Sequence, residues 1–145
     1  MTTEKELYSR IQPLLFHHGI PSRIENSIGS GLPDVIYVVA RHIIFIELKI
    51  VRSGKIFLRP FQYSYAMRVQ PHINNSHMWY LCDDKDVWKL FTFKKLKEFI
   101  TGDGNSGKIT VDVRGIKPDF ILTNSLSVIE WILHIKLTEL KEESS

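Results

Sequence analysis

The chain has 145 residues, of which 43% are hydrophobic and 24% are charged. This composition is typical of one globular domain and excludes disordered, collagen-like and coiled-coil chains. Nineteen Lys and Arg against sixteen Asp and Glu give a net charge of +3, which only weakly favours a polyanionic partner. A single cysteine, Cys82, excludes an internal disulfide framework and a cysteine-based zinc site.

The hydropathy of the chain argues against a membrane protein. No apolar run approaches the ~18 residues that a membrane span needs. The first residues, Met-Thr-Thr-Glu-Lys-Glu, lack the pattern of a signal peptide. We therefore expect a cytoplasmic protein without a membrane partner, located in the host cytoplasm if a phage encodes it.

The first predicted element is a helix over residues 3–18. Thr3 followed by Glu6 fits a capping box, and apolar residues follow at helical spacing. Pro13 lies inside this run and predicts a kink or an early break. Gly19 is the expected C-terminal stop of the helix.

A β-hairpin is predicted next. Residues 27–33 are rich in glycine and serine and read as a loop. Two runs of β-branched residues, 35–40 and 43–51, follow and are separated only by Arg41 and His42. This spacing predicts two antiparallel strands that turn on those two residues, although the turn lacks the preferred Asn-Gly chemistry.

The rest of the chain alternates between helices and strands. The predicted elements are a turn at 54–55, a helix over 60–69, strands over 77–82 and 87–91, a short helix over 93–100, strands over 109–113 and 120–122, and a helix over 126–140. This order predicts an α/β or α+β fold with a central mixed sheet flanked by helices. We expect a core over residues 1–100, a surface loop over 101–108, and a C-terminal extension over 109–145 that packs on the core or forms a dimer interface.

A basic stretch follows the hairpin, because no Asp or Glu lies between Glu47 and Asp83. Aromatic residues are interleaved with its cations, which are Lys49, Arg52, Lys55, Arg59 and Arg68. Such a stretch suits a phosphate backbone and exposed bases. The alternative is a solvated surface whose aromatic residues belong to the core.

Three charged residues converge on the predicted hairpin. A turn on Arg41 and His42 pairs Asp34 with Lys49 and makes Glu47 a diagonal neighbour of Asp34. All three side chains then share one face of the hairpin, within roughly 5–8 Å of one another. A register slip of one residue would break this convergence.

Clustered carboxylates on an apolar hairpin need a counter-charge or a metal. The oxygens of Asp34 and Glu47 suit Mg²⁺ or Mn²⁺. Lys49 beside them could orient or deprotonate an attacking water, or stabilise the charge that develops on phosphorus. The alternative is a structural Asp–Lys–Glu cluster on a solvent face.

Three ordered motifs resemble a known nuclease pattern. They are Gly31-Leu32-Pro33-Asp34, Phe45-Ile46-Glu47-Leu48-Lys49 and Arg59-Pro60-Phe61-Gln62. Together they resemble the PD-(D/E)XK nuclease superfamily, and more narrowly its VRR-NUC branch, over roughly residues 4–92. The resemblance implies a restriction-endonuclease-like core and a Mg²⁺- or Mn²⁺-dependent phosphodiesterase that acts on DNA.

The resemblance also implies roles for individual residues. Asp34 and Glu47 would be metal ligands, together with the backbone carbonyl of Leu48. Lys49 would serve catalysis, and Gln62 would support the site or its water.

This family usually takes a further acid from its first helix. We expect Glu6 in this role because it lies on the predicted helix ahead of Gly19. Glu25 and Glu4 are the alternatives, and the capping function of Glu6 competes with a catalytic one.

We therefore predict a metal-dependent endonuclease that is selective for branched DNA such as a Holliday junction. The resemblance implies a homodimer, because a four-way junction needs two symmetric incisions. Five apolar residues at helical spacing favour a dimer surface on the last helix, namely Leu126, Ile129, Leu133, Leu137 and Leu140. The alternative function is a non-catalytic DNA-binding or assembly module with a nuclease-like fold.

The histidines and the cysteine are expected to have structural or surface roles. His17 and His18 are adjacent on a helix and point apart, which argues against joint metal ligation. His72 and His77 are expected to decorate a loop. Cys82 lies on an apolar strand and is expected in the core.

Overall fold

The computed structural model describes residues 2–24, 31–101 and 109–144. The strands are β1 (Ile20–Arg23), β2 (Val35–Val39), β3 (His42–Ile50), β4 (Lys55–Leu58), β5 (Met78–Asp84), β6 (Val87–Thr92), β7 (Ile100–Thr101), β8 (Ile109–Asp112) and β9 (Phe120–Leu122). The helices are α1 (Glu4–Phe16), α2 (Pro60–Val69), α3 (Phe93–Lys97) and α4 (Ser125–Ser144), with 3₁₀ turns η1 (Gln70–His72) and η2 (Asn75–His77).

A mixed sheet forms the centre of the fold. Its six strands run in the order β1-β2-β3-β5-β6-β9, and β3 pairs with β5 in parallel while the other neighbours are antiparallel. A smaller sheet has the order β4-β8-β7. The predicted α+β class, with a central mixed sheet flanked by helices, is confirmed.

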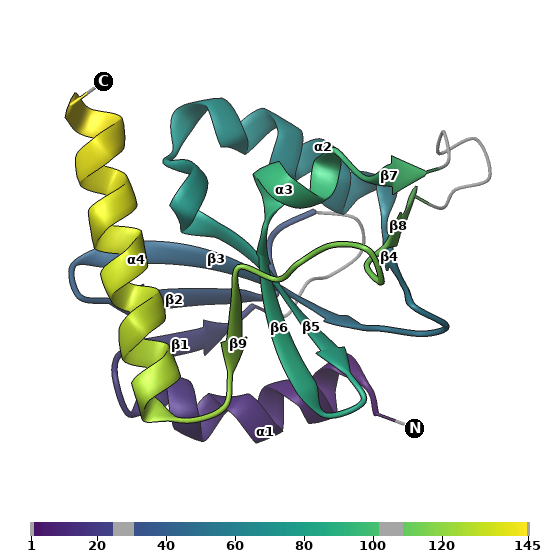
Figure 1. The fold of residues 1–145 in the computed structure, drawn as a ribbon, viewed down its shortest axis with the longest axis horizontal. Coiled ribbons are helices and arrows are strands. Elements are labelled where there is room, and N and C mark those ends of the chain that lie inside the picture. The colour runs from purple at the N-terminus through teal and green to yellow at the C-terminus, as the bar shows by residue number, and fades with distance from the viewer. Residues whose placement is uncertain (1, 25–30, 102–108, 145) are drawn as a thin grey trace.

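Two cores lie on opposite faces of the central sheet. The first packs α1 and α4 against the sheet and includes Leu7, Ile11 and Trp131. The second lies under α2, α3 and the small sheet. Figure 1 shows α1 and α4 on one side and α2 and α3 on the other. Burial of each large apolar side chain contributes roughly 1.5–3 kcal/mol, so both cores are needed to hold the layers together.

The β2–β3 hairpin turns one residue earlier than the sequence predicts. Val39 pairs with His42, and the turn residues Ala40 and Arg41 have φ values of 49° and 67°. Positive φ at both positions is typical of a type I′ turn, whose twist matches that of the strands. The predicted turn on Arg41 and His42 is therefore wrong. The register moves by two, so every side chain keeps its predicted face.

The sequence pattern does not predict β1 or β4. β1 contains Pro21 but lies at the edge of the sheet, where a missing N–H is tolerated. β4 begins at Lys55, which was predicted to lie in a turn. The turn is formed by Ser53 and Gly54, with φ values of 51° and 74°. Both strands are only 4 residues long and depend on pairing with a neighbour.

The C-terminal part is integrated with the rest of the fold. β8 pairs with β4, and β9 adds the last strand to the central sheet beside β6. α4 contributes Val128, Trp131 and Ile135 to the first core. Residues 102–108 of the predicted surface loop lie outside the described residues, and Thr101 belongs to β7. α3 ends at Lys97, earlier than predicted, because β7 begins at Ile100.

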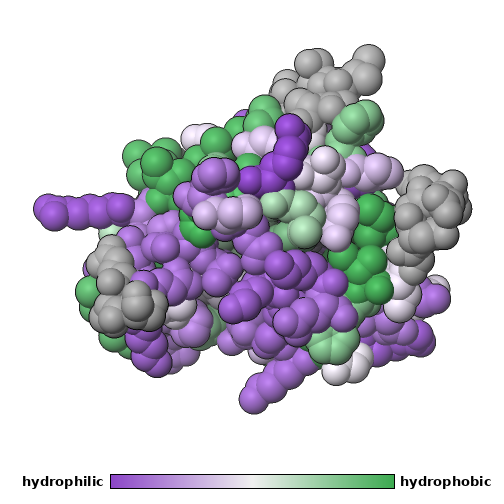
Figure 2. Space-filling model, turned by 90° about the horizontal axis from the view of Figure 1, so that it is seen from above, coloured by the Kyte–Doolittle hydropathy of each residue, from purple (hydrophilic) through white to green (hydrophobic). Residues whose placement is uncertain are grey.

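The surface is mixed in polarity. Figure 2 shows a face that is hydrophilic over most of its centre, with hydrophobic groups toward its edges. Among the described residues, no helix is long and apolar enough to cross a membrane.

Candidate active site

Asp34, Glu47 and Lys49 meet on the face of the hairpin that looks toward α2. Ile44, Ile46 and Leu48 of β3 belong to the first core, so the alternate residues Glu47 and Lys49 point to the opposite side of the sheet. Continuing the β2–β3 register by one residue sets Asp34 opposite Glu47. The predicted convergence on one face is confirmed, with Glu47 as the direct partner in place of Lys49.

Asp34 is held at the end of β2 by the backbone of β3. Its Oδ2 accepts a hydrogen bond of 2.8 Å from the N–H of Leu48. The Asp34 carboxylate also interacts with that of Glu47, whose pKa it raises. This contact positions Asp34 beside the β3 backbone from which Leu48 was expected to offer its carbonyl.

Gln62 joins the two buried charges of β3. Its Nε2 donates to Glu47 Oε2 at 2.9 Å, and its Oε1 accepts from Lys49 Nζ at 2.8 Å. The same Oε1 accepts from the N–H of Arg59, the N-cap of α2, at 3.2 Å. The start of α2 and the charged pair are thus connected through one amide, whose orientation is set by these three contacts.

Burial makes the charged form of this cluster unfavourable when no metal ion is bound. Glu47 and Lys49 are only 6% and 4% exposed. Desolvation raises the pKa of Glu47 well above its ordinary value, and the nearby Asp34 raises it further, whereas Lys49 opposes the shift. A divalent cation between the carboxylates would remove this penalty, and oxygen donors are what Mg²⁺ and Mn²⁺ prefer. The residues present therefore fit a hard divalent metal ion.

Glu4 is the acid of α1 that lies near the cluster. It is half-buried and interacts electrostatically with Lys49 and Asp34, and burial raises its pKa. Glu6 is exposed, and its backbone N–H donates to the Thr3 side chain at the N-cap. The structure thus brings Glu4, and not Glu6, to Asp34 and Lys49. Glu25 lies outside the described residues.

The position of Glu4 follows from the helical periodicity of α1. The buried residues Leu7, Ile11 and Leu15 define the face that packs on the sheet. At about 100° per residue, Glu4 falls within this stripe, whereas Glu6 lies roughly 140° from its centre. The apolar stripe was the signal that could have identified Glu4 from the sequence.

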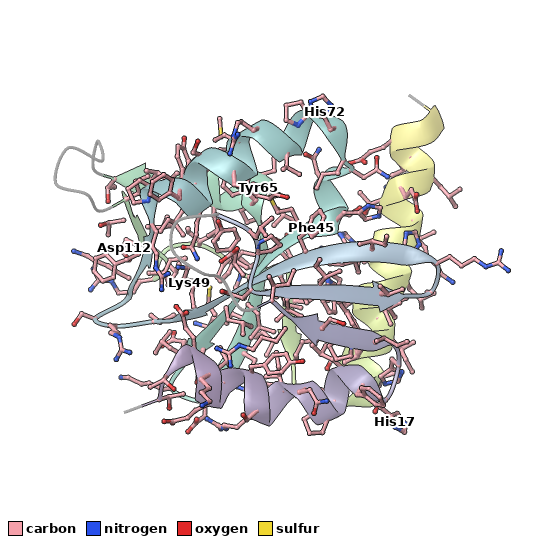
Figure 3. All side chains as sticks on the ribbon, turned by 180° about the vertical axis from the view of Figure 1, so that it is seen from behind. His17, Phe45, Lys49, Tyr65, His72 and Asp112 are labelled. Atoms are coloured by element: carbon pink, nitrogen blue, oxygen red, sulfur yellow. The ribbon has the colours of Figure 1, made fainter. Side chains whose placement is uncertain are left out.

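A groove beside Lys49 gathers part of the predicted basic stretch. Lys49, Arg52 and Arg59 line it together with Glu4 and Phe57. In Figure 3, Lys49 lies near the end of β3 that borders this groove. Cations and an exposed aromatic ring therefore adjoin the carboxylate cluster.

Two residues of the predicted basic stretch, Lys55 and Arg68, do not line the groove. Lys55 is paired across the small sheet with Asp112 and interacts with it electrostatically. Arg68 is exposed in the last turn of α2, on the same face as Phe61, which precedes it by two helical turns.

The aromatic residues of the basic stretch divide between two roles. Trp79 and Tyr80 are fully buried, as the core interpretation predicts. Phe57 and Phe61 are 43% and 64% exposed, as the binding interpretation predicts. Cys82 is fully buried, so its predicted core position is confirmed.

The comparisons with known proteins are distant. No protein-family model matches the chain, and no curated protein does. Among solved structures, it is similar to Hjc, a Holliday junction resolvase from Archaeoglobus fulgidus, at 12% identity and a TM-score of 0.45, over 72% of this chain and 85% of that one. It is also similar to a bacterial homing endonuclease at 11% identity and a TM-score of 0.48, over 100% of both chains. Both neighbours are nucleases by name. At this distance they assign no activity to the chain.

Tyr80 is a neighbour of the cluster that sequence reasoning missed. It pairs with Glu47 across the parallel β3–β5 ladder and lines a small cavity with Phe45, Glu47 and Tyr65. In Figure 3, Phe45 and Tyr65 lie between β3 and α2. The Tyr80 hydroxyl is buried without a hydrogen-bond partner among the described residues, and burial raises its pKa well above the ordinary value. It is therefore a neutral hydrogen-bond donor beside a carboxylate.

Proposed function

We propose that this protein is a divalent-metal-dependent endonuclease that hydrolyses DNA phosphodiester bonds. The observation that carries the proposal is the cluster of Glu47 and Lys49, buried and joined by Gln62, with the half-buried Asp34 beside them. Burying charged groups such as Glu47 and Lys49 costs stability, and a bound metal ion would offset part of that cost. The groove that borders Lys49 supplies a basic surface for a polyanion.

Each site residue has a role in this proposal. Asp34 and Glu47, with the Leu48 carbonyl, would hold Mg²⁺ or Mn²⁺. When bound, such an ion supplies Lewis-acid chemistry that neutralises phosphate charge and acidifies a water. Lys49 donates hydrogen bonds to the attacking water or to a phosphate oxygen as negative charge develops. Gln62 orients Lys49 and Glu47 through the hydrogen bonds that it makes to both side chains.

The acid from α1 in this proposal is Glu4. It lies near both Lys49 and Asp34 and adds a third carboxylate to the site. A third acid can accept a proton from water or complete the set of oxygen ligands.

DNA would enter along the groove. Arg52 and Arg59 are suited to phosphate oxygens, because guanidinium groups bind them in a bidentate manner. Phe57 between them offers a ring on which an unstacked base can lie. Lys55 and Arg68 would contact DNA that extends over the small sheet or along the outer face of α2.

We further propose a branched substrate and a homodimer. The five residues predicted to form an apolar stripe on α4 are all exposed: Leu126 61%, Ile129 43%, Leu133 52%, Leu137 61% and Leu140 61%. Pairing two such stripes would remove them from water and relate two sites by a two-fold axis. Sedimentation at micromolar concentration without DNA tests this, and a single 17 kDa species would refute the dimer.

Cleavage assays test the activity. Supercoiled plasmid and a four-way junction are incubated with Mg²⁺, with Mn²⁺ and with EDTA. We expect cutting with either metal, none with EDTA, and preference for the junction. The alternative, a non-catalytic DNA-binding module, predicts DNA binding with no metal-dependent cutting.

A further inference from the structure

A second cluster of metal-ligating side chains lies at the opposite end of β3. His42 begins β3, His77 ends η2, and Glu139 comes from α4. One ligand atom from each lies within 4.8 Å of the others. His42 Nδ1 is 2.9 Å from Glu139 Oε2, and the two imidazole rings are edge to face with centroids 5.2 Å apart.

One nitrogen of this cluster is left without a partner. His77 Nε2 is buried and makes no hydrogen bond among the described residues. A buried polar atom without a partner costs about 1–3 kcal/mol, so it needs an explanation. The contact between His42 and Glu139 gives each of these side chains a partner, but it gives none to His77 Nε2.

We propose that His42, His77 and Glu139 bind a Zn²⁺ ion. Two imidazoles and one carboxylate are a known zinc ligand set, which leaves a fourth position open to water. Zinc bonds of about 2.0–2.2 Å set tetrahedral ligand atoms roughly 3.4 Å apart. Small side-chain rotations would therefore close the present cluster around the ion.

The charges around the cluster also favour a cation. Glu142 follows Glu139 by three residues, on the same side of α4, and interacts electrostatically with His77. The two carboxylates offset much of the charge that a divalent ion brings.

The zinc site is separate from the carboxylate cluster. His42 and Glu47 are five residues apart on one strand, or about 17 Å at 3.3 Å per residue. Imidazole ligands suit Zn²⁺ and other transition metals, whereas carboxylate oxygens suit Mg²⁺ and Mn²⁺. Bound zinc would fasten α4 to the hairpin and to η2, three segments that are distant in the sequence.

Metal binding is tested on the full chain after treatment with EDTA and removal of the chelator. The titrations use the Asp34→Asn, Glu47→Gln double variant, so that the proposed catalytic site does not contribute. Calorimetry with Zn²⁺ is expected to give one equivalent, and Co²⁺ substitution a visible absorption band typical of tetrahedral ligation. Zn²⁺ should also raise the midpoint of thermal unfolding, because it binds only the folded state.

Single substitutions in that background locate the site. His77→Gln and Glu139→Gln should each weaken Zn²⁺ binding at least tenfold and abolish the thermal shift. His72→Gln, an exposed histidine on η1, should change neither, and the pair His17→Gln and His18→Gln serves as a second control. Circular dichroism verifies that each variant is folded.

Two outcomes would overturn the proposal. One is the absence of Zn²⁺ binding at micromolar concentration, and the other is one equivalent that persists in folded His77→Gln and Glu139→Gln. Neither outcome bears on the endonuclease, whose test is cleavage with Mg²⁺.

Discussion

The two ends of β3 present different chemistry. At one end, Glu47 and Lys49 are almost fully buried and are held by Gln62 of α2. At the other, His42 and Glu139 keep 10% and 25% of their side chains exposed. One strand thus carries an oxygen-rich site under one helix and an imidazole site under another. Since the two sites share no side chain, they should respond independently to mutation and to metal.

The largest effect is expected from the carboxylates of the buried end. Asp34→Asn and Glu47→Gln each remove a charged ligand while preserving shape. Mutating a residue that supports a metal ligand lowers metal affinity or activity by ~10–100-fold. Loss of the ligand itself should therefore lower the cleavage rate by more than ~100-fold. Plasmid and junction cleavage with Mg²⁺ measure it. Glu98→Gln, an exposed carboxylate just after α3, is the matched control and should leave the rate unchanged. Normal cutting by both variants would mean that the site is misassigned.

Gln62→Ala tests the coupling within the buried end of β3, because it removes the amide that joins Glu47 to Lys49. We expect a loss of roughly 10–100-fold in turnover, with DNA affinity almost unchanged. Single-turnover kinetics and a binding titration separate the two quantities. Ser64→Ala, an exposed change on the same helix, controls for effects on α2. A loss of affinity equal to the loss of turnover would make Gln62 a DNA contact instead.

The groove cations should act on binding. Arg52→Ala and Arg59→Ala should each weaken DNA affinity and reduce the salt dependence, by a slope of about 0.9 per lost phosphate contact on duplex. Lys49→Ala should instead depress turnover with affinity largely intact. Titrations at several salt concentrations measure the slope. A change in slope for Lys55→Ala or Arg68→Ala would extend the DNA path beyond the groove, and equal losses of affinity for all variants would make Lys49 another backbone contact.

The smallest effect is on stability in the absence of metal. The pKa of Glu47 is higher in the folded state than the ~4.3 of an unfolded chain. The stability it contributes is therefore complete below about pH 4 and is lost as pH rises through the folded pKa. Glu47→Gln should raise the unfolding midpoint by a few degrees at neutral pH, with no difference near pH 4. Thermal denaturation at both pH values tests this, with Glu6→Gln as an exposed control. A variant less stable than the wild type at neutral pH would contradict it.

Local patterns in the sequence predicted most of the elements around the site. Helical spacing predicted α1, Pro60 in a first helical turn predicted α2, and β-branched runs predicted β2 and β3. The predicted turn was wrong, but the prediction that Asp34 and Glu47 share a face was right. Side chains alternate along a strand, so a register shift of two residues keeps each on its side of the sheet. Short strands such as β1 and β4 were missed, since their pairing with distant strands stabilises them more than their own composition does.

The hairpin with its charged residues and the helix that carries Gln62 follow from local sequence, because they depend on contacts between residues close in the chain. Tertiary structure decided which acid of α1 approaches the site, since packing of Leu7 and Ile11 on the sheet sets the rotation of that helix. It alone also assembled His42, His77 and Glu139, which lie 35 and 62 positions apart. No local periodicity links residues on three separate elements, and only the packing of α4 and η2 against the end of β3 brings them together.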